Sequence, residues 1–121
     1  MVTQWTVLSS LKQMASLDED GMAFGLSLCV TSLEEIRARL RDGADENDDR
    51  IGRAAAGLAF YKLALKRISA DGAASFKAGD VSVTQNPAEL LAIAAKVRDE
   101  ALTAAAPLMK DELFLFRKID V

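Results

Sequence analysis

The sequence predicts one mainly α domain, a four-helix bundle-like fold with a small β-hairpin between the third and fourth helices and an extended apolar C-terminal tail. Three observations predict this fold. Apolar residues recur at spacings of three and four over four separate stretches. Alanine is abundant and only 6% of the residues are aromatic, which suits closely packed helices better than a β-sandwich. A length of 121 residues gives room for a single domain, 1–121, with a real core.

The first helix is expected to begin near Thr3 and to end before the sequence SLDEDG. Its apolar residues are spaced by three and four, which predicts one buried face. They are Trp5, Leu8, Leu11 and Ala15.

The second helix follows Asp18, Glu19 and Asp20, whose carboxylates are favourable at a helix N-terminus. Spacings that alternate between four and three then predict one continuous apolar seam. Its members are Met22, Leu26, Cys29, Leu33, Ile36 and Leu40. A free-standing coiled coil normally needs more heptads, so we interpret this segment as a core helix of a globular domain.

Segment 42–49, DGADENDD, holds five carboxylates and a glycine, and is expected to be an exposed loop. Three of its residues fit the first ligand positions of a calcium loop: Asp45, Asn47 and Asp49. However, Arg50 and Ala56 stand where that loop requires glycine and a bidentate glutamate. The sequence therefore predicts no metal site here, but a solvated loop that caps the next helix.

The third helix is expected from about Asp49 to Ser69. Its predicted apolar stripe consists of Ile51, Ala55, Leu58, Tyr61, Leu65 and Ile68. Glycines and alanines at 52, 54–57 and 59 would let another backbone approach closely. Of the adjacent rings of Phe60 and Tyr61, we expect one to enter the core and the tyrosine to keep its hydroxyl near water.

Segment 75–84, SFKAGDVSVT, predicts a β-hairpin with Gly79 and Asp80 as its loop. Phe76, Lys77 and Ala78 would pair with Val83, Ser82 and Val81, so that the apolar residues share one face. That face is expected to pack on the helices, because a lone hairpin is marginally stable. Lys77 and Asp80 flank the tip, where they either contact a partner or, in the case of Lys77, protect a sheet edge.

The fourth helix has the strongest start signal, with Asn86 as N-cap, Pro87 at the first helical position and Glu89 completing a capping box. Pro107 is expected to end or kink it. The predicted apolar face consists of Leu90, Ala94, Val97, Ala101, Ala104 and Leu108.

The tail, 110–121, contains Leu113, Phe114, Leu115 and Phe116 in a row. These residues are apolar on both sides of any strand that they form. Such a segment has to be covered on both faces, or be covered when a partner arrives.

The composition predicts neither an enzyme nor a cofactor or metal site. With one cysteine and no histidine, a single chain builds no disulfide and no Cys/His zinc site. Cys29 lies on the apolar seam and has no histidine to activate it. No glycine motif cradles a phosphate. The net charge of −3, without a dense basic run, argues against tight nucleic-acid binding.

The N-terminus lacks a basic segment followed by an apolar one, and no run of 18 apolar residues occurs. We therefore expect neither secretion by such a signal nor a membrane span. With a single cysteine, an intracellular setting is the default expectation.

The order of these elements resembles the small head–tail connector proteins of tailed bacteriophages and prophages. The likeness covers nearly the whole chain. Its most specific parts are Leu17-Asp18-Glu19-Asp20 before the second helix, and KAGDVSVT leading into Asn86-Pro87. The third helix departs from the pattern, since Phe60 and Tyr61 stand in place of a tryptophan-like aromatic cluster.

The resemblance implies a structural protein that forms a ring on the portal, links head to tail, and occurs in the virion or in the bacterial cytoplasm during assembly. Its partners would be copies of itself, the portal protein, and a tail-side adaptor or stopper. On this hypothesis Phe76 and Val83 anchor the hairpin, Lys77 and Asp80 meet the next component, and Leu113–Phe116 contact an adjacent subunit or the portal. Head-to-tail surfaces of this kind close rings.

A second hypothesis is a cytosolic helical adaptor or regulatory module that binds one partner helix. The connector hypothesis predicts concentration-dependent higher oligomers, whereas the adaptor hypothesis predicts a small defined stoichiometry.

Overall fold

The computed structural model describes residues 2–15, 17, 19–71, 76–78, 81–83 and 87–110, with backbone alone for 19, 20, 69–71, 76–78, 81–83 and 87. Everything below concerns these residues. The elements in chain order are α1 (Gln4–Met14), α2 (Glu19–Ala38), α3 (Asp49–Asp71), β1 (Phe76–Ala78), β2 (Val81–Val83), α4 (Pro87–Ala104) and the 3-10 turn η1 (Ala106–Leu108). The mainly helical fold and its helical-bundle character are confirmed.

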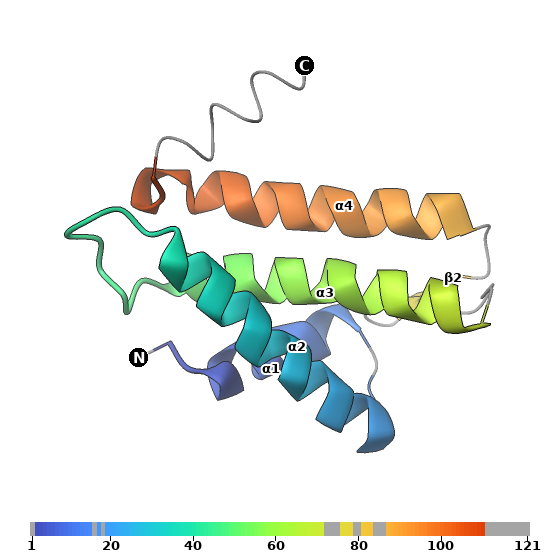
Figure 1. The fold of residues 1–121 in the computed structure, drawn as a ribbon. Helices are drawn as coiled ribbons and strands as arrows, with labels where there is room; N and C mark the ends of the chain where they lie inside the picture. Colours follow the sequence, from blue (N-terminus) through green and yellow to red (C-terminus); the bar gives the residue numbers. More distant parts are fainter. Residues whose placement is uncertain are drawn as a thin grey trace.

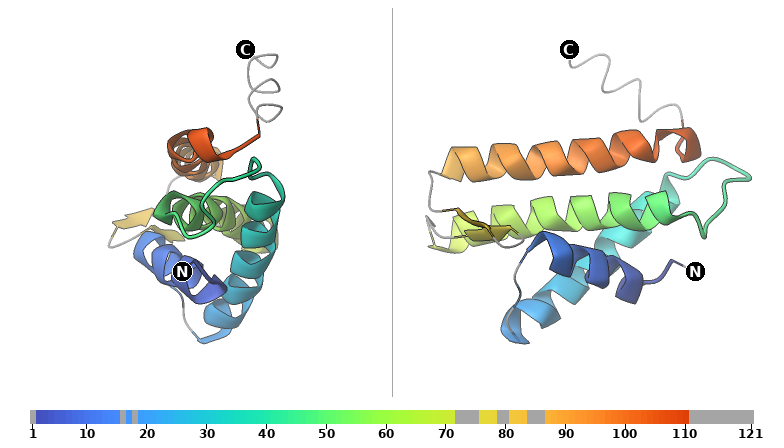
Figure 2. Two further views of the ribbon diagram at one scale, coloured as in Figure 1. Left: turned by 90° about the vertical axis from the view of Figure 1, so that its left-hand side faces the viewer. Right: turned by 180° about the vertical axis from the view of Figure 1, so that it is seen from behind.

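Helix α3 lies at the centre and packs against α1, α2 and α4. Figure 1 shows α4 running beside α3 along its length, while α2 crosses α3 obliquely. The end-on view shows α4 and α1 on opposite sides of α3, while α2 runs along a third side, from the level of α3 to that of α1 (Figure 2). A central helix needs several apolar sides, which explains why α3 is so rich in alanine.

Helix α1 begins as expected, because Thr3 is its N-cap. The Thr3 hydroxyl accepts a bond from the Thr6 amide at 3.4 Å, and the Thr6 hydroxyl accepts one from the Thr3 amide at 3.3 Å. The expected burial of Trp5 is wrong, since this side chain is 60% exposed. The buried residues of the helix are Val7, Leu8 and Leu11, so the core face is centred about a third of a turn away from Trp5.

The predicted seam of α2 is confirmed over its C-terminal half, where Cys29, Leu33, Ile36 and Leu40 are buried. Met22 and Leu26 are half-buried and pack against that core. Gly25 faces α1, with Leu17 and Leu11 atoms within 3.5 Å of the position that a Cβ would occupy.

The predicted stripe of α3 is only partly correct. Ile51 and Ala55 are buried, but Leu65 is 39% exposed, and Leu58, Tyr61 and Ile68 are half-buried. The residues that actually fill the core are Ile51, Ala54, Ala55, Ala56, Ala59, Phe60, Leu63 and Ala64. Contacts with helices on several sides select small residues around the helix, which a single-stripe prediction misses.

Helices α3 and α4 approach closely at Gly57. A Cβ added there would lie 3.1 Å from the Cβ of Ala101 and 3.3 Å from the Cα of Arg98. The predicted close approach of a second backbone to α3 is therefore confirmed at this residue. Glycine permits the contact because it has no side chain.

Helix α4 begins at Pro87 as predicted, and ends at Ala104, so Pro107 follows a helix that has already ended and lies in η1. Ala104, which we expected on the buried face, is exposed, and Ala105 is buried instead. The amide of Ala105 still donates to the carbonyl of Ala101 at 3.2 Å, so Ala105 continues the apolar face one turn after Ala101. The proposed N-cap, Asn86, lies outside the described residues.

Strands β1 and β2 pair antiparallel between α3 and α4, with Phe76 opposite Val83, Lys77 opposite Ser82 and Ala78 opposite Val81. The ribbon is three residues long on each side. Its backbone alone is described.

Candidate interaction surface

The described structure places the proposed hairpin anchors Phe76 and Val83, with Lys77, on a paired ribbon, but leaves their side chains and Asp80 undescribed. Leu113–Phe116 lie outside the described residues too. The roles proposed for these residues, and the packing of the hairpin face on the helices, therefore remain predictions. What the structure does define is the point where the tail begins and the surface around it.

The start of the tail is held against the end of α2. The amide of Lys110 donates to the carbonyl of Arg39 at 2.9 Å, and the amide of Arg41 donates to the carbonyl of Leu108 at 2.9 Å. These two bonds flank an antiparallel bridge between Leu40 and Met109. Met109 is 2% exposed and Leu40 is 9% exposed, so the bridge also closes this end of the core.

The side chain of Arg41 reinforces that junction. Its Nε donates to the carbonyl of Pro107 at 2.8 Å, across 66 positions of sequence. Its guanidinium also donates to the carbonyl of Asp42 at 3.4 Å. A planar guanidinium with several donors suits this task, because carbonyls at a helix end lack intrahelical partners. Arg41 therefore ties the end of α2 to the turn after α4.

Four residues of α3 form a partly open apolar strip that we call the outer stripe: Leu58, Tyr61, Leu65 and Ile68. Their spacing of three, four and three places them on one side of the helix. Leu65 is the most exposed of the four, at 39%. The strip lies beside the buried residues Phe60, Leu63 and Ala64 on one side and the more exposed Lys62 and Lys66 on the other.

The outer stripe runs between α4 and α2. On the α4 side, the guanidinium of Arg98 lies 4.2 Å from the centroid of the Tyr61 ring, in cation–π contact. On the α2 side, Lys62 Nζ is 2.9 Å from Glu35 Oε1, and Lys66 Nζ lies 5.9 Å from the Phe24 ring. Phe24 is itself 36% exposed. The stripe is thus apolar along its length and bordered by cations on both sides.

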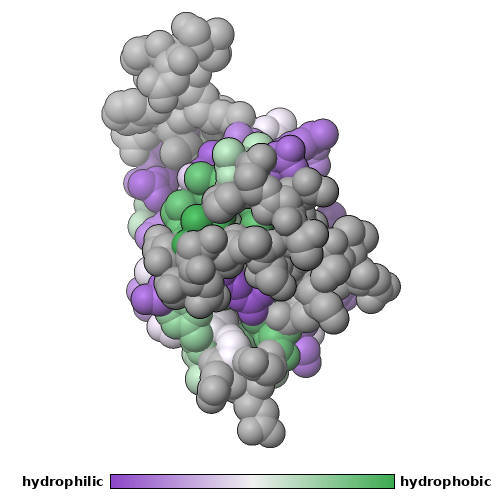
Figure 3. All heavy atoms as spheres, turned by 90° about the vertical axis from the view of Figure 1, so that its right-hand side faces the viewer, coloured by the Kyte–Doolittle hydropathy of each residue, from purple (hydrophilic) through white to green (hydrophobic). Residues whose placement is uncertain are grey.

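The space-filling view shows where hydrophobic and hydrophilic residues lie at one end of the molecule. Figure 3 faces the right-hand side of Figure 1 and shows hydrophobic atoms gathered toward the upper left, next to hydrophilic ones. Exposed apolar area that adjoins charged side chains is typical of surfaces that bind another chain segment.

The acidic loop caps α3, as predicted. Asp48 Oδ1 accepts bonds from the Arg50 amide at 2.9 Å and from Arg50 Nε at 3.0 Å. The side-chain bond from Arg50 lowers the pKa of Asp48 to about 2. A polar hollow beside it is lined by 37 and 40–47. Within the described residues, no group of three or more histidine, cysteine or acidic residues is arranged to hold a metal ion.

Cys29 is a buried hydrophobe, as predicted. It is 0% exposed, and burial raises the pKa of its thiol to about 11. The thiol therefore stays protonated near neutral pH and is a poor nucleophile.

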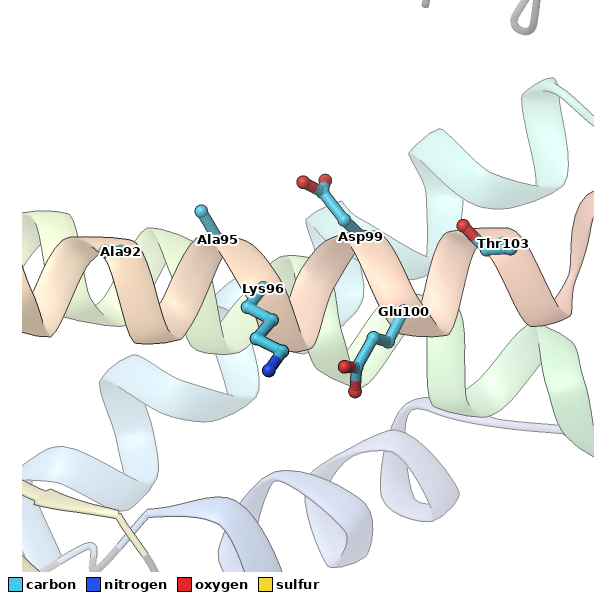
Figure 4. A pocket seen from close by; sticks show the side chains of 6 residues that line it. All are labelled: Ala92, Ala95, Lys96, Asp99, Glu100 and Thr103. Atoms are coloured by element: carbon cyan, nitrogen blue, oxygen red, sulfur yellow. The ribbon is translucent and has the colours of Figure 1, made fainter.

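A shallow depression lies on the outer face of α4, away from α3. Its lining residues are Ala92, Ala95, Lys96, Asp99, Glu100 and Thr103. Figure 4 shows that all six come from this one helix, with Lys96 and Glu100 extending to the same side. A hollow built by one helix alone encloses nothing, so we assign it no chemistry.

Sequence reasoning missed Arg41 and Arg98. No periodicity in a sequence signals a bond from a side chain to a distant carbonyl or ring. Their common signal is weaker: each is an arginine next to an apolar strip, where its stem can pack while its head finds a partner.

No protein-family model, no curated protein and no solved structure matches this chain. Among the helices of the described part, none combines the length and apolar character needed to cross a bilayer.

Proposed function

We propose that this protein is a structural assembly protein that joins copies of itself through its C-terminal segment, as a head–tail connector of a tailed bacteriophage or prophage. The observation that carries the proposal is the fixed starting point of the tail. The bridge between Leu40 and Met109, with Arg41 bonded to Pro107, holds Lys110 at a defined place on the helical body. Four consecutive apolar residues begin three positions later.

The physical reason is the cost of leaving Leu113–Phe116 in water. Burying one large apolar side chain contributes about 1.5 to 3 kcal/mol, so four of them supply a substantial drive for association. A segment that leaves one anchored point and binds an acceptor surface elsewhere gives a head-to-tail interface. Repeated around an axis, that interface closes a ring, which is the form that the resemblance implies. The portal and a tail-side adaptor or stopper are the further partners in this proposal.

Truncation after Lys110 tests the proposal, because the cut leaves every hydrogen bond of the anchor in place. Light scattering after size exclusion should show the full chain gaining mass with concentration and the truncated chain staying monomeric. Circular dichroism should show nearly equal helicity in both. A chain that stops after Arg117 is the matched control, since it keeps Leu113–Phe116 and should assemble like the full chain.

Equal assembly by the chain that ends at Lys110 would reject the role given to the tail. The virion role is tested separately, by sedimentation with portal rings: assembly without portal binding would support self-association and reject the connector.

A helical adaptor is the second candidate, and the outer stripe favours it specifically. Spacings of three, four and three on an exposed helix face match the anchors by which a partner helix is bound. In that case light scattering would show a monomer at every concentration, for the full chain as for the truncated one.

A further inference from the structure

We propose that the outer stripe of α3 is the seat of the chain's own C-terminal segment, with one side of Leu113–Phe116 lying on Leu58, Tyr61 and Leu65. This inference rests on the proposed function in that the same segment is the assembling part. It specifies where the segment lies in the free subunit, and which side of the segment stays available to bind a neighbouring subunit.

The first argument is the place where the described chain ends. Lys110 is bonded to the carbonyl of Arg39, and Glu35, one turn earlier in α2, is ion-paired with Lys62 of α3. Four residues of helix span about 6 Å. The tail therefore starts about one helical turn from the flank of the outer stripe. Figure 1 shows the chain after α4 meeting the end of α2 at this place.

The second argument is length. An extended chain covers at most about 3.3 to 3.6 Å per residue, so Leu113–Phe116 lie within roughly 10 to 20 Å of Lys110. Leu58 and Leu65 are about 10 Å apart along α3, at 1.5 Å per residue. The apolar part of the tail and the outer stripe thus match in reach and in length. A segment tethered this closely meets its own stripe at a far higher effective concentration than a neighbour's.

The third argument is charge. Asp111 and Glu112 come directly before the apolar residues of the tail. The borders of the outer stripe carry three cations, of which Lys62 and Arg98 are already ion-paired with Glu35 and Asp99. Lys66, which lies over the Phe24 ring, is therefore the border cation with which a carboxylate at the start of the tail would pair as the apolar residues reach the stripe. Such pairs fix register more than they add affinity.

The consequence concerns assembly. In an extended segment Leu113 and Leu115 share one side, and Phe114 and Phe116 share the other. One side covers the outer stripe and the other remains apolar and open. Seating the tail on its own subunit therefore creates the surface that a second copy binds, and explains why a segment that is apolar on both sides follows a fixed anchor.

Thiol labelling at Leu65→Cys tests the seat. The rate of modification is compared between the full chain and the chain that ends at Lys110, at a concentration where light scattering shows the full chain to be monomeric. A tail seated about nine-tenths of the time slows labelling about tenfold relative to the truncated chain. The wild-type protein provides the background, because Cys29 is buried and its thiol has a raised pKa.

Val30→Cys is the matched control. Val30 is 37% exposed, close to the exposure of Leu65. It lies on α2 six residues from Phe24, about 120° around that helix from the side that borders the outer stripe. Its labelling rate should be the same in both chain lengths. Circular dichroism of each variant verifies that the helices are intact.

Equal labelling of Leu65→Cys in the long and short chains would overturn the inference while leaving the proposed function standing. Protection that arises only as oligomers form would assign the stripe to a neighbour's tail, and would likewise overturn it. A second measurement uses the double variant Leu65→Cys with Phe114→Cys, or with Leu115→Cys. Oxidation should give a cross-linked monomer for one of the pairs, and a cross-linked dimer alone would contradict the seat on the same chain.

Discussion

At position 32 of α2 a serine is completely buried, and its hydroxyl has no hydrogen-bond partner among the described residues. A buried polar group without a partner costs about 1 to 3 kcal/mol. Ser32→Ala removes the hydroxyl and keeps most of the volume. We expect it to raise the free energy of unfolding by about 1 kcal/mol, measured from the urea midpoint at constant slope.

Cys29→Ser is the converse change at a neighbouring buried position, since it puts a hydroxyl where a thiol packs as a hydrophobe. It should lower the free energy of unfolding by about 1 to 3 kcal/mol. If Ser32→Ala instead destabilises the protein as much as Cys29→Ser does, the hydroxyl of Ser32 has a partner that matters.

Single residues show where sequence reasoning reaches its limit. The choice between Phe60 and Tyr61 was confirmed: Phe60 is 1% exposed, and Tyr61 is half-buried beneath Arg98. The hydroxyl of tyrosine favours contact with water, so the residue type alone indicates which of the two rings is buried. The predicted burial of Trp5 was wrong, because spacings of three and four fit two neighbouring faces of a short helix equally well. Packing against α2 and α3 determines which face is buried, and a local sequence pattern holds no information about that packing.

Among the elements, the contact of α3 with α4 depends on a single missing side chain. Gly57→Ala puts a methyl group 3.1 Å from Ala101 Cβ and 3.3 Å from Arg98 Cα, which is backbone and cannot rotate away. Overpacking costs about 1 to 3 kcal/mol, and the better helix propensity of alanine returns about 1. We expect a net loss of about 1 kcal/mol in urea unfolding.

Gly52→Ala is the matched control on the same helix. There a Cβ would meet only side-chain atoms, Val2 Cγ1 at 3.5 Å and Thr6 Cγ2 at 3.8 Å, which are ordinary contact distances. The propensity gain then dominates, and stability should rise by about 0.5 to 1 kcal/mol. Two variants that shift the midpoint in the same direction would contradict the close approach at Gly57.

The elements themselves were largely predictable, because each carries a local signal. Thr3, the acidic segment before α3 and Pro87 mark helix starts, and the seam of α2 marks a core face. The faces of α3 were not predictable in the same way. A helix that touches α1, α2 and α4 has no single apolar side, so the predicted stripe is buried at Ile51 and Ala55 but partly open from Leu58 onward.

For the molecule as a whole, the sequence predicted that the tail needs a cover but not where the tail begins. The anchor joins residues 39–41 to 107–110, and nothing near either segment in sequence points to the other. The outer stripe has the same origin, since it is left partly open where α2 crosses α3 obliquely, and that crossing is set by tertiary packing. The candidate surface is formed by tertiary packing and could not be predicted from the sequence. The apolar segment that we propose to bind there is visible in the sequence itself.

Arg41 joins the end of α2 to the turn after α4, and its substitution tests how much this side chain contributes to that junction. Arg41→Ala removes the bond from Nε to the Pro107 carbonyl but keeps the backbone bridge. Because the side chain is exposed, we expect a loss of only about 1 kcal/mol of stability. The larger effect should be local: the Lys110 amide, bonded to Arg39, should exchange its hydrogen several-fold faster, while amides in the middle of α3 change only with global stability. Arg39→Ala, at an exposed arginine two residues away, should leave Lys110 protected. Equal deprotection by both variants would show that the backbone bridge alone holds the tail in place.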